Sequence, residues 1–135
     1  VQYQFVVPDS AHEELRSIFL RLVKAQVPSF LTVLKRFGPG NSGFLSFPIA
    51  GWTLTVDIPT DVPDLMRLLD SLDQQVAAAG GRVYLAKDSR MPAQMLPQMY
   101  PRLDAWLQLR NQMDPRGVFA SDLGRRLHLA NAPRD

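Results

Sequence analysis

The sequence predicts an α+β fold: an antiparallel sheet in β-α-β-β-α-β order, two helices on one face of that sheet, and a helical C-terminal segment. Three observations predict it. The chain has 135 residues, 46% of them hydrophobic, which is enough for one globular core. Segments of period-two and of helical periodicity follow one another in the split order of ferredoxin-like folds. The last third is helical in pattern and rich in Met and Pro.

The first strand and the first helix lie at the start of the chain. Residues 1–7, VQYQFVV, alternate apolar side chains with glutamines, which predicts a half-buried strand. A helix follows in residues 9–26, where Ser10 and Glu13 have the spacing of a capping box. Its apolar positions form one stripe: Leu15, Ile18, Phe19 and Leu22.

The second and third strands are predicted in residues 29–37 and 52–58, on either side of a glycine-rich loop. That loop, residues 38–43, reads GPGNSG and fits G-x-G-x-x-G, the fingerprint of dinucleotide-binding loops. The fingerprint requires a helix directly after the glycines, because the helix N-terminus binds the pyrophosphate. Here an alternating strand pattern follows, so we interpret the loop as a connection between two antiparallel strands.

The second helix and the fourth strand complete the sheet unit. Asp61 and Pro63 mark the start of this helix, and a Gly-Gly pair at 80–81 marks its end. Residues 82–86, RVYLA, predict the fourth strand. We therefore place one unit in residues 1–86.

The tail, residues 87–135, is predicted to be a separate helical segment. One helix ends at Asp114, which precedes a proline, and Ser121 is placed to cap a short final helix. The scattered methionines indicate core filling. Because this segment is not part of the βαββαβ unit, we expect it to need a surface on which to pack.

Alternation divides the predicted sheet into two faces. The helix-side face is expected to hold Tyr3, Phe5, Val7, Phe30, Leu34, Trp52, Leu54, Val56, Val83 and Leu85. The open face is expected to hold Gln2, Gln4, Leu31, Val33, Lys35, Phe37, Thr53, Thr55, Tyr84 and Ala86. This second set mixes amides, hydroxyls, one ammonium and aromatic rings, which fits either a ligand-binding wall or a sheet face that is exposed or covered by a partner.

Composition excludes several kinds of function. A net charge of +2 gives no electrostatic footprint for nucleic acid. There is no cysteine, and the two histidines, His12 and His128, lack metal-ligand spacing, so no metal site is expected. No apolar run approaches the ~20 residues of a membrane span. The chain opens inside a strand pattern without an initiator Met, which suggests a piece of something longer.

Several stretches resemble a known family. RVYLAKDSR at 82–90 and MYPRLDAWLQLRNQMDPRGVFASDLGRRL at 99–127 resemble the C-terminus of FAD-linked oxidases of the vanillyl-alcohol oxidase type. Their D-P-x-x-V-F-x-S-D pattern runs here from Asp114 to Asp122. QYQFV, FGPGN, LSFPIAGWTLTVD and GGRVYLAKDSR resemble, in the same order, the decaprenylphosphoryl-ribose oxidases among them. The resemblance runs from Gln2 to about Leu129.

The resemblance implies the C-terminal part of a bacterial FAD-dependent oxidoreductase. The chain would hold the second half of a substrate-binding domain and a segment that returns to an N-terminal FAD domain, with the FAD-phosphate loops upstream. The expected substrate is a sugar or lipid-phosphate-linked sugar, oxidised at a secondary hydroxyl in cell-wall biosynthesis. A short-chain reductase would complete the epimerisation. The expected location is the cytoplasm or the periphery of the cell membrane, and the fragment alone is expected to be inactive.

The resemblance also assigns roles to residues. Those that match substrate-pocket positions are Gln2, Gln4, Leu31, Val33, Lys35, Phe37, Thr53 and Thr55. Tyr84 and Lys87 match positions beside the flavin, with Lys87 as the catalytic residue. An ammonium there can stabilise negative charge on reduced flavin and orient the sugar hydroxyl. Lys87 has helix-side parity in an ideal strand, so the strand is expected to end or bulge before it.

Two departures leave the substrate open. Well-known members carry Asn and Cys where this chain has Thr53 and Thr55, and Thr lacks the thiol nucleophile. One alternative is a FAD-linked aldonolactone or sugar oxidase with another substrate. The other is a non-catalytic ferredoxin-like ligand-binding domain.

Overall fold

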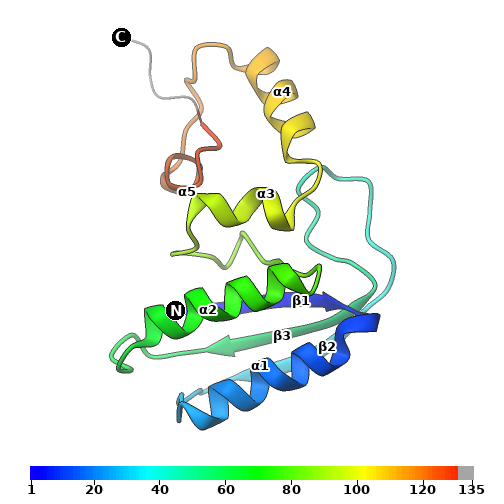
Figure 1. Ribbon diagram of the computed structural model, residues 1–135. Helices are drawn as coiled ribbons and strands as arrows, with labels where there is room; N and C mark the ends of the chain where they lie inside the picture. Colours follow the sequence, from blue (N-terminus) through cyan, green and yellow to red (C-terminus); the bar gives the residue numbers. More distant parts are fainter. Residues whose placement is uncertain (131–135) are drawn as a thin grey trace.

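The computed structural model describes residues 1–130 and contains a four-stranded antiparallel sheet in the order β2-β3-β1-β4 (Figure 1). Along the chain the sheet unit consists of β1 (Gln2–Pro8), α1 (His12–Lys24), β2 (Thr32–Phe37), β3 (Gly51–Asp57), α2 (Leu65–Ala78) and β4 (Arg82–Val83). The tail holds a 3-10 turn (Ala93–Met95), α3 (Leu96–Met99), α4 (Leu103–Met113) and α5 (Asp122–Arg126). The predicted fold class and the order β-α-β-β-α-β are confirmed.

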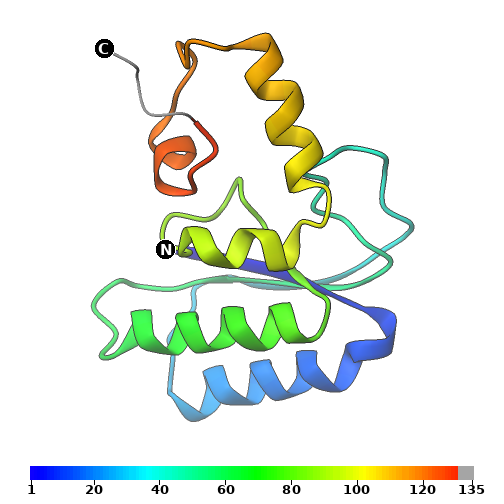
Figure 2. The ribbon, with the colours of Figure 1, turned by 45° about the horizontal axis from the view of Figure 1, so that its top comes forward.

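Helices α1 and α2 lie side by side on one face of the sheet (Figure 2). Their apolar stripes and the facing strand residues form the core, in which Phe5, Ile18 and Leu69 are completely buried. Polar side chains connect the two helices above this core, since Gln75 accepts a hydrogen bond from Arg21 at 2.8 Å and donates one to Glu14 at 2.7 Å. The helix layer thus removes the apolar side of β1 and β3 from water.

Within the paired strands, the register confirms the predicted division into two faces, whereas Phe30, Leu31, Leu85 and Ala86 lie outside these strands. Thr55 of β3 pairs with Gln4 on one side and with Val33 on the other. The next position, Leu54, pairs with Phe5 of β1. Because directly paired residues of antiparallel strands point to the same face, Gln4, Val33 and Thr55 share the open face, and Phe5 and Leu54 share the helix side.

Two local predictions were wrong. The capping box does not form: Ser10 lies in a 3-10 turn, and α1 begins at His12 without a side-chain cap. The fourth strand is shorter than predicted, with regular pairing only at Arg82–Val83. The Tyr84 N–H still donates to the Gln4 carbonyl at 2.8 Å, after which the chain turns. A 3-10 turn before α1 and a turn after β4 therefore replace the predicted elements at these two ends.

Glycines end α2 as predicted. Gly80 has φ +72°, its N–H donates to Ala77, and the Gly81 N–H donates to Val76 at 2.8 Å, which is a Schellman motif. A Cβ on Gly81 would lie 2.4 Å from the Val6 carbonyl oxygen. This position therefore requires glycine because helix and sheet approach closely there.

One glycine of the loop 38–43 is required by local geometry as well. No helix follows them; the chain runs on to β3. A Cβ on Gly40 would lie 2.5 Å from the Pro48 carbonyl oxygen, so this glycine lets the connection fold back on itself. The interpretation of this segment as a strand connection is confirmed.

The tail packs on the sheet unit of its own chain, which the sequence analysis did not anticipate. Met91 and Met99 are buried in the common core, while Met113 is largely exposed. Tyr100 is also buried, and its hydroxyl donates to the Val83 carbonyl at 2.7 Å. Among residues 1–130, no helix has the length and hydrophobicity needed to cross a membrane.

Candidate functional site

The open face of the sheet carries two glutamines whose amides are held in place. Gln2 donates from Nε2 to Asp57 Oδ1 at 2.6 Å, and Gln4 donates from Nε2 to Thr53 Oγ1 at 3.2 Å. Each bond crosses from β1 to β3, so the sheet fixes the orientation of both amides. Both glutamines are half-exposed, and each has an amide oxygen that can accept a further hydrogen bond.

Strand β2 adds a cation and apolar side chains to this face. Lys35 is exposed and stands opposite Thr53, next to the Gln4 amide. Val33 is paired with Thr55, which contributes a hydroxyl group to this face. Leu31 precedes β2, and its carbonyl accepts the Asp57 N–H at 3.0 Å. The predicted pocket residues of β1, β2 and β3 therefore adjoin one another.

An aromatic cluster closes one end of the open face. The ring of Phe47 stacks on Tyr84 with centroids 4.4 Å apart, and it meets Phe37 edge-on at 5.8 Å. Phe37 belongs to β2 and Tyr84 follows β4, so Phe47 lies over the two strands between them. This cover explains why Val6 and Thr53, which point to the open face, are buried. The face thus has a dry aromatic end and a polar end.

The turn after β4 carries Lys87. Its N–H donates to the Tyr84 carbonyl at 3.0 Å, and the side chain is exposed. The strand therefore ends before Lys87, as its parity required. The exposed Lys87 thus follows Tyr84, which belongs to the aromatic end of the face, by three residues in the same turn.

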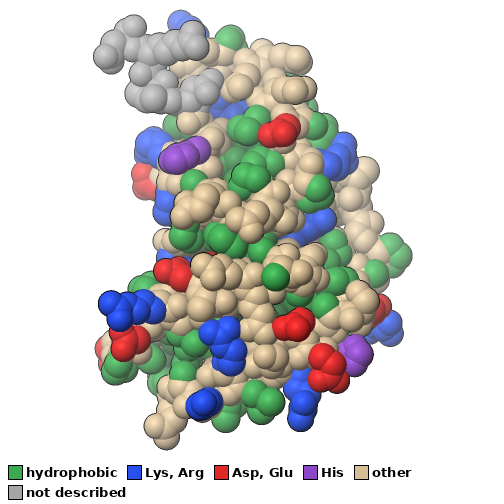
Figure 3. Space-filling view, in the orientation of Figure 1, with side chains coloured by type: hydrophobic (Ala, Val, Ile, Leu, Met, Phe, Trp, Pro, Cys, Tyr) green, Lys and Arg blue, Asp and Glu red, His purple; other side chains and the backbone are tan. Residues whose placement is uncertain are grey.

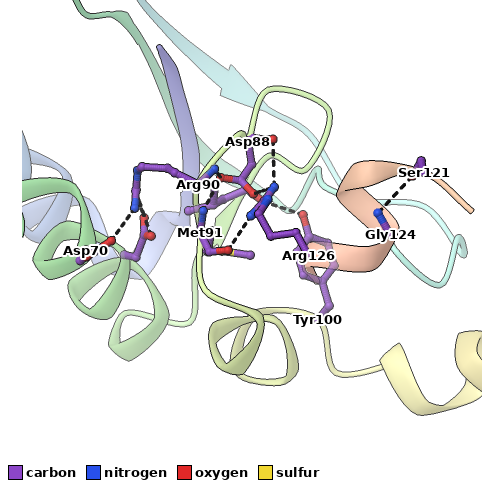
Figure 4. A network of polar contacts seen from close by, with 10 residues as sticks. Asp70, Asp88, Arg90, Met91, Tyr100, Ser121, Gly124 and Arg126 are labelled. Carbon is purple, nitrogen blue, oxygen red and sulfur yellow. Dashed lines mark hydrogen bonds and ion pairs between the residues drawn. The ribbon is translucent and has the colours of Figure 1, made fainter. Parts of the chain in front are cut away.

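Asp88 directly follows this turn and holds it in place through hydrogen bonds (Figure 4). Its Oδ1 accepts the N–H groups of Arg90 and Met91 at 3.1 and 2.9 Å. Its Oδ2 accepts from Arg126 of α5 at 2.7 Å, and Arg126 also donates to the Met91 carbonyl. The last helix of the described chain therefore fixes the segment that presents Lys87.

A second buried ion pair lies beside the first. Arg90 donates to both carboxylate oxygens of Asp73 at 2.9 Å and to Asp70 at 2.8 Å (Figure 4). Burial raises the pKa of Asp73 to about 6, although the Arg90 charge opposes the shift. The two networks connect α2, the turn and α5.

A hollow of about 590 Å³ opens between the turn and the tail helices, and its sides are largely hydrophobic. Hydrophobic side chains also appear among polar ones on the outer surface of the tail segment (Figure 3). It is lined by Leu45, Tyr84, Leu85, Ala86, Trp106, Arg110, Phe119, Ala120, Ser121, Leu123, Gly124, Leu129 and Ala130. Tyr84 thus borders both the open face and this hollow.

The D-P-x-x-V-F-x-S-D pattern forms the far side of the hollow. Asp114 accepts the N–H groups of Val118 and Phe119 at 2.8 and 2.9 Å, and Ser121 caps α5 by accepting the Gly124 N–H at 3.0 Å. Burial raises the pKa of the Asp114 carboxyl, but those N–H groups and a nearby arginine outweigh it, so the net pKa is lowered. The turn holds Val118 and Phe119 outward, and both are largely exposed.

Sequence reasoning missed four residues of this region. Phe47 and Asp57 complete the open face, and Asp88 with Arg126 supports the turn. Alternation could have placed Asp57, but Phe47 lies in a loop without periodicity, and a pair 38 residues apart leaves no local signal. Within the described residues, no cluster of His, Cys, Asp or Glu could hold a metal ion.

Comparison with known proteins identifies the family to which the chain belongs. The family model for D-arabinono-1,4-lactone oxidase matches residues 53–127, which is more than half of the chain. The chain therefore belongs to this family of FAD-linked oxidases.

Two curated relatives match nearly the whole chain. The chain is 50% identical over 129 residues to decaprenylphosphoryl-beta-D-ribose oxidase of Mycolicibacterium smegmatis. It is 46% identical over 129 residues to a Streptomyces coelicolor protein described only as uncharacterized, in the mprA 5′ region. Each match covers 96% of this chain, but the chain spans only 28% and 35% of the two relatives.

Proposed function

We propose that this chain forms one wall of the active site of a FAD-dependent oxidase that takes hydride from the sugar carbon bearing a secondary hydroxyl, while that hydroxyl loses its proton and the carbon becomes a carbonyl. The observation that carries the proposal is the juxtaposition of the open face with the Tyr84–Lys87 turn. Fixed amides and the Lys35 ammonium could hold several hydroxyls of a sugar, and the Lys87 ammonium, three residues after Tyr84, would then stand beside the oxidant.

The residues at the turn fit one edge of a flavin. The Tyr84 ring is backed by Phe47, so it is a rigid apolar contact for a flat ring system. The exposed Lys87 ammonium fits the pyrimidine edge, where a hydrogen-bond donor of positive charge is useful. When bound, FAD supplies the hydride acceptor.

The chain's own residues would position and polarise the substrate. Gln4 and Lys35 would bind sugar hydroxyls and hold the ring against the acceptor. Lys87 would stabilise the negative charge that develops on the hydride acceptor as hydride arrives, which makes its effect largest in the transition state. Phe47 and Tyr84 would exclude water from this end of the face.

The substrate we favour is decaprenylphosphoryl-ribose, because the named relative matches nearly the whole chain at 50% identity. The second candidate is an aldonolactone, because the matching family model is that of an aldonolactone oxidase. Thr55, which is half-exposed on the open face, is where the two would be distinguished by direct contact, whereas the buried Thr53 would act through the Gln4 amide that it holds. A reductase that acts on the oxidised sugar would be the partner in the first case.

We also propose that two parts of the chain have different roles. Residues 1–86 would be the second half of the substrate domain, and residues 87–135 the segment that reaches a FAD domain. The outward side chains of Val118 and Phe119 support this, because they give the tail an unburied apolar contact.

The test uses a chimaera in which this chain replaces the matching region of the M. smegmatis oxidase. Lys87→Ala should retain FAD but reduce it on the order of a hundredfold more slowly, since one preorganised donor is worth about 3 kcal/mol. Lys87→Arg should rescue poorly, because a planar fork does not replace a compact ammonium.

Stopped-flow flavin reduction with a prenylphosphoryl ribose, and separately with D-arabinono-1,4-lactone, gives the readout. Lys24→Ala is the matched control, because Lys24 is an exposed lysine at the end of α1. A change of less than about threefold for Lys87→Ala, like that expected for a solvated surface lysine, would refute its role.

A further inference from the structure

The Lys87 side chain is held only through the backbone to which it is attached. Within residues 1–130, no hydrogen bond or ion pair joins the Lys87 ammonium to another residue. Its N–H donates to the Tyr84 carbonyl at 3.0 Å, and the next N–H, that of Asp88, donates to the Leu85 carbonyl at 3.2 Å. Because a lysine has a long, flexible stem, its ammonium reaches a defined place only if the backbone beneath it is rigid.

Asp88 makes this backbone rigid with the help of Arg126. The Asp88 side chain is 2% exposed, and its Oδ1 accepts the N–H groups of Arg90 and Met91. A buried carboxylate needs a positive partner, because removal from water penalises its charge. Arg126 donates to Asp88 Oδ2 at 2.7 Å and to the Met91 carbonyl at 2.6 Å (Figure 4). One guanidinium therefore holds both ends of the segment 88–91.

Helix α5, which carries Arg126, has other contacts that keep it in place. Ser121 caps the helix by accepting the Gly124 N–H, and Leu127 and Leu129 are buried in the common core. These contacts do not involve the guanidinium. A substitution that removes only the guanidinium is therefore expected to loosen the turn after β4, without release of α5 or loss of the fold.

We propose that Arg126 is a positioning residue of the active site, which acts on hydride transfer through Lys87 and not by contact with substrate or flavin. The inference rests on the proposed function, because it takes Lys87 as the group that stabilises the reduced acceptor. A misplacement of about 1 Å can slow a reaction on the order of a hundredfold. A loosened turn would therefore weaken the effect of the ammonium although the lysine itself is still present.

Amide hydrogen exchange in the 135-residue chain tests the positioning without any catalysis. In Arg126→Met, the N–H groups of Lys87 and Met91 should exchange on the order of tenfold faster, because the segment that holds them opens more often. The amides of β3, between β1 and β2, should stay protected. Arg125→Met is the matched control: this neighbouring arginine pairs with Asp122 inside α5, so its loss should leave the turn unchanged.

Stopped-flow flavin reduction in the M. smegmatis chimaera tests the effect on the reaction. Arg126→Met should slow reduction on the order of tenfold, while FAD content and the substrate Kd change by less than about twofold. Arg126→Lys should lie between wild type and Arg126→Met, because an ammonium keeps the charge but cannot bridge Asp88 and Met91 as a guanidinium does. Arg125→Met should reduce flavin at the wild-type rate.

The double variant separates positioning from a general structural role. In a chain that already carries Lys87→Ala, Arg126→Met should slow flavin reduction no further, because the group that it positions is absent. If Arg126 merely stabilised the fold, its substitution would slow the reaction by the same factor whether or not Lys87 is present.

Three results would refute Arg126 as a positioning residue. One is unchanged exchange at Lys87 in Arg126→Met, and another is an equal slowing by Arg126→Met in the two backgrounds. The third is slow reduction after Lys87→Ala but normal reduction after Arg126→Met, which leaves the proposed function standing. Normal reduction after Lys87→Ala refutes the proposed function, and the inference with it. If Arg126→Met loses the protection of β3, Arg126→Lys replaces it in every comparison.

Discussion

The two faces of the sheet differ in how they are covered, although the same strands supply both. On the helix side, Phe5, Val7 and Leu54 are buried evenly beneath α1 and α2. On the open face, burial is confined to the end beneath Phe47, and the other end keeps Gln2 and Gln4 half-exposed. Along β1 and β3, one face is part of the core. The other face has an aromatic end from which water is excluded and a polar end that is half-exposed to water.

This difference shows how a small sheet can combine stability with a polar binding surface. Apolar burial on one side supplies most of the free energy of folding. The other side can then keep amides and an ammonium near water without loss of the fold. The aromatic end excludes water only beside the turn that carries Lys87, where charge would act most strongly.

Side-chain truncations on the two faces should lower the free energy of unfolding by very different amounts. Phe5→Ala removes a fully buried ring and should lower the free energy of unfolding by about 4 kcal/mol. Gln4→Ala removes one hydrogen bond on the open face and should cost about 1 kcal/mol. Urea denaturation of the 135-residue chain measures both, and equal losses would contradict the division into core and binding face.

The buried carboxylate on the helix side should make stability depend on pH. The pKa of Asp73 is raised to about 6 by burial, so its contribution to stability is fully present below about pH 4. It is lost as the pH rises through 6, by up to about 3 kcal/mol, since one pKa unit corresponds to about 1.4 kcal/mol.

Denaturation at pH 5 and pH 7.5 measures this effect. In Asp73→Asn the part of the pH dependence that comes from this carboxyl should vanish. Asp70→Asn, which changes the exposed partner of Arg90, should keep it. A wild-type protein that becomes more stable across this interval would show that the Arg90 charge dominates instead.

The aromatic cover of the open face should contribute less to the free energy of unfolding than the core does. Phe47→Ala should cost about 2 kcal/mol, because the ring is nearly buried but lies in a loop that can relax. It should also expose Tyr84, which acrylamide quenching of tyrosine fluorescence would detect. Phe30→Ala is the control: with a ring that is 91% exposed, it should change the stability of the isolated chain by less than about 0.5 kcal/mol.

Periodicity was sufficient to predict most of the fold. The alternation in β1 and β3 and the stripes of both helices correctly gave the order of elements and the two faces. Periodicity mispredicted the start of α1 and the length of β4, because local backbone geometry determines where these elements begin and end. Whether a serine caps a helix depends on the backbone angles around it, and these are not written in the spacing of Ser10 and Glu13.

The site could be predicted only along the strands. Parity placed Gln4, Lys35 and Thr55 on one face because a strand has a fixed period. The roles of Tyr84 and Lys87 came from a family resemblance and remain predictions. Phe47 could not be found from sequence, because a loop residue is positioned by contacts that close only in the folded chain.

The ion pair between Asp88 and Arg126 has a consequence for chain integrity. Leu127 and Leu129 are buried next to it, so α5 is held by contacts that do not depend on the connection through residues 114–121. Arg116 lies in that connection and is exposed, which makes it a natural site for trypsin. A cut after Arg116 should therefore give two polypeptides that migrate together on gel filtration and separate only in denaturant.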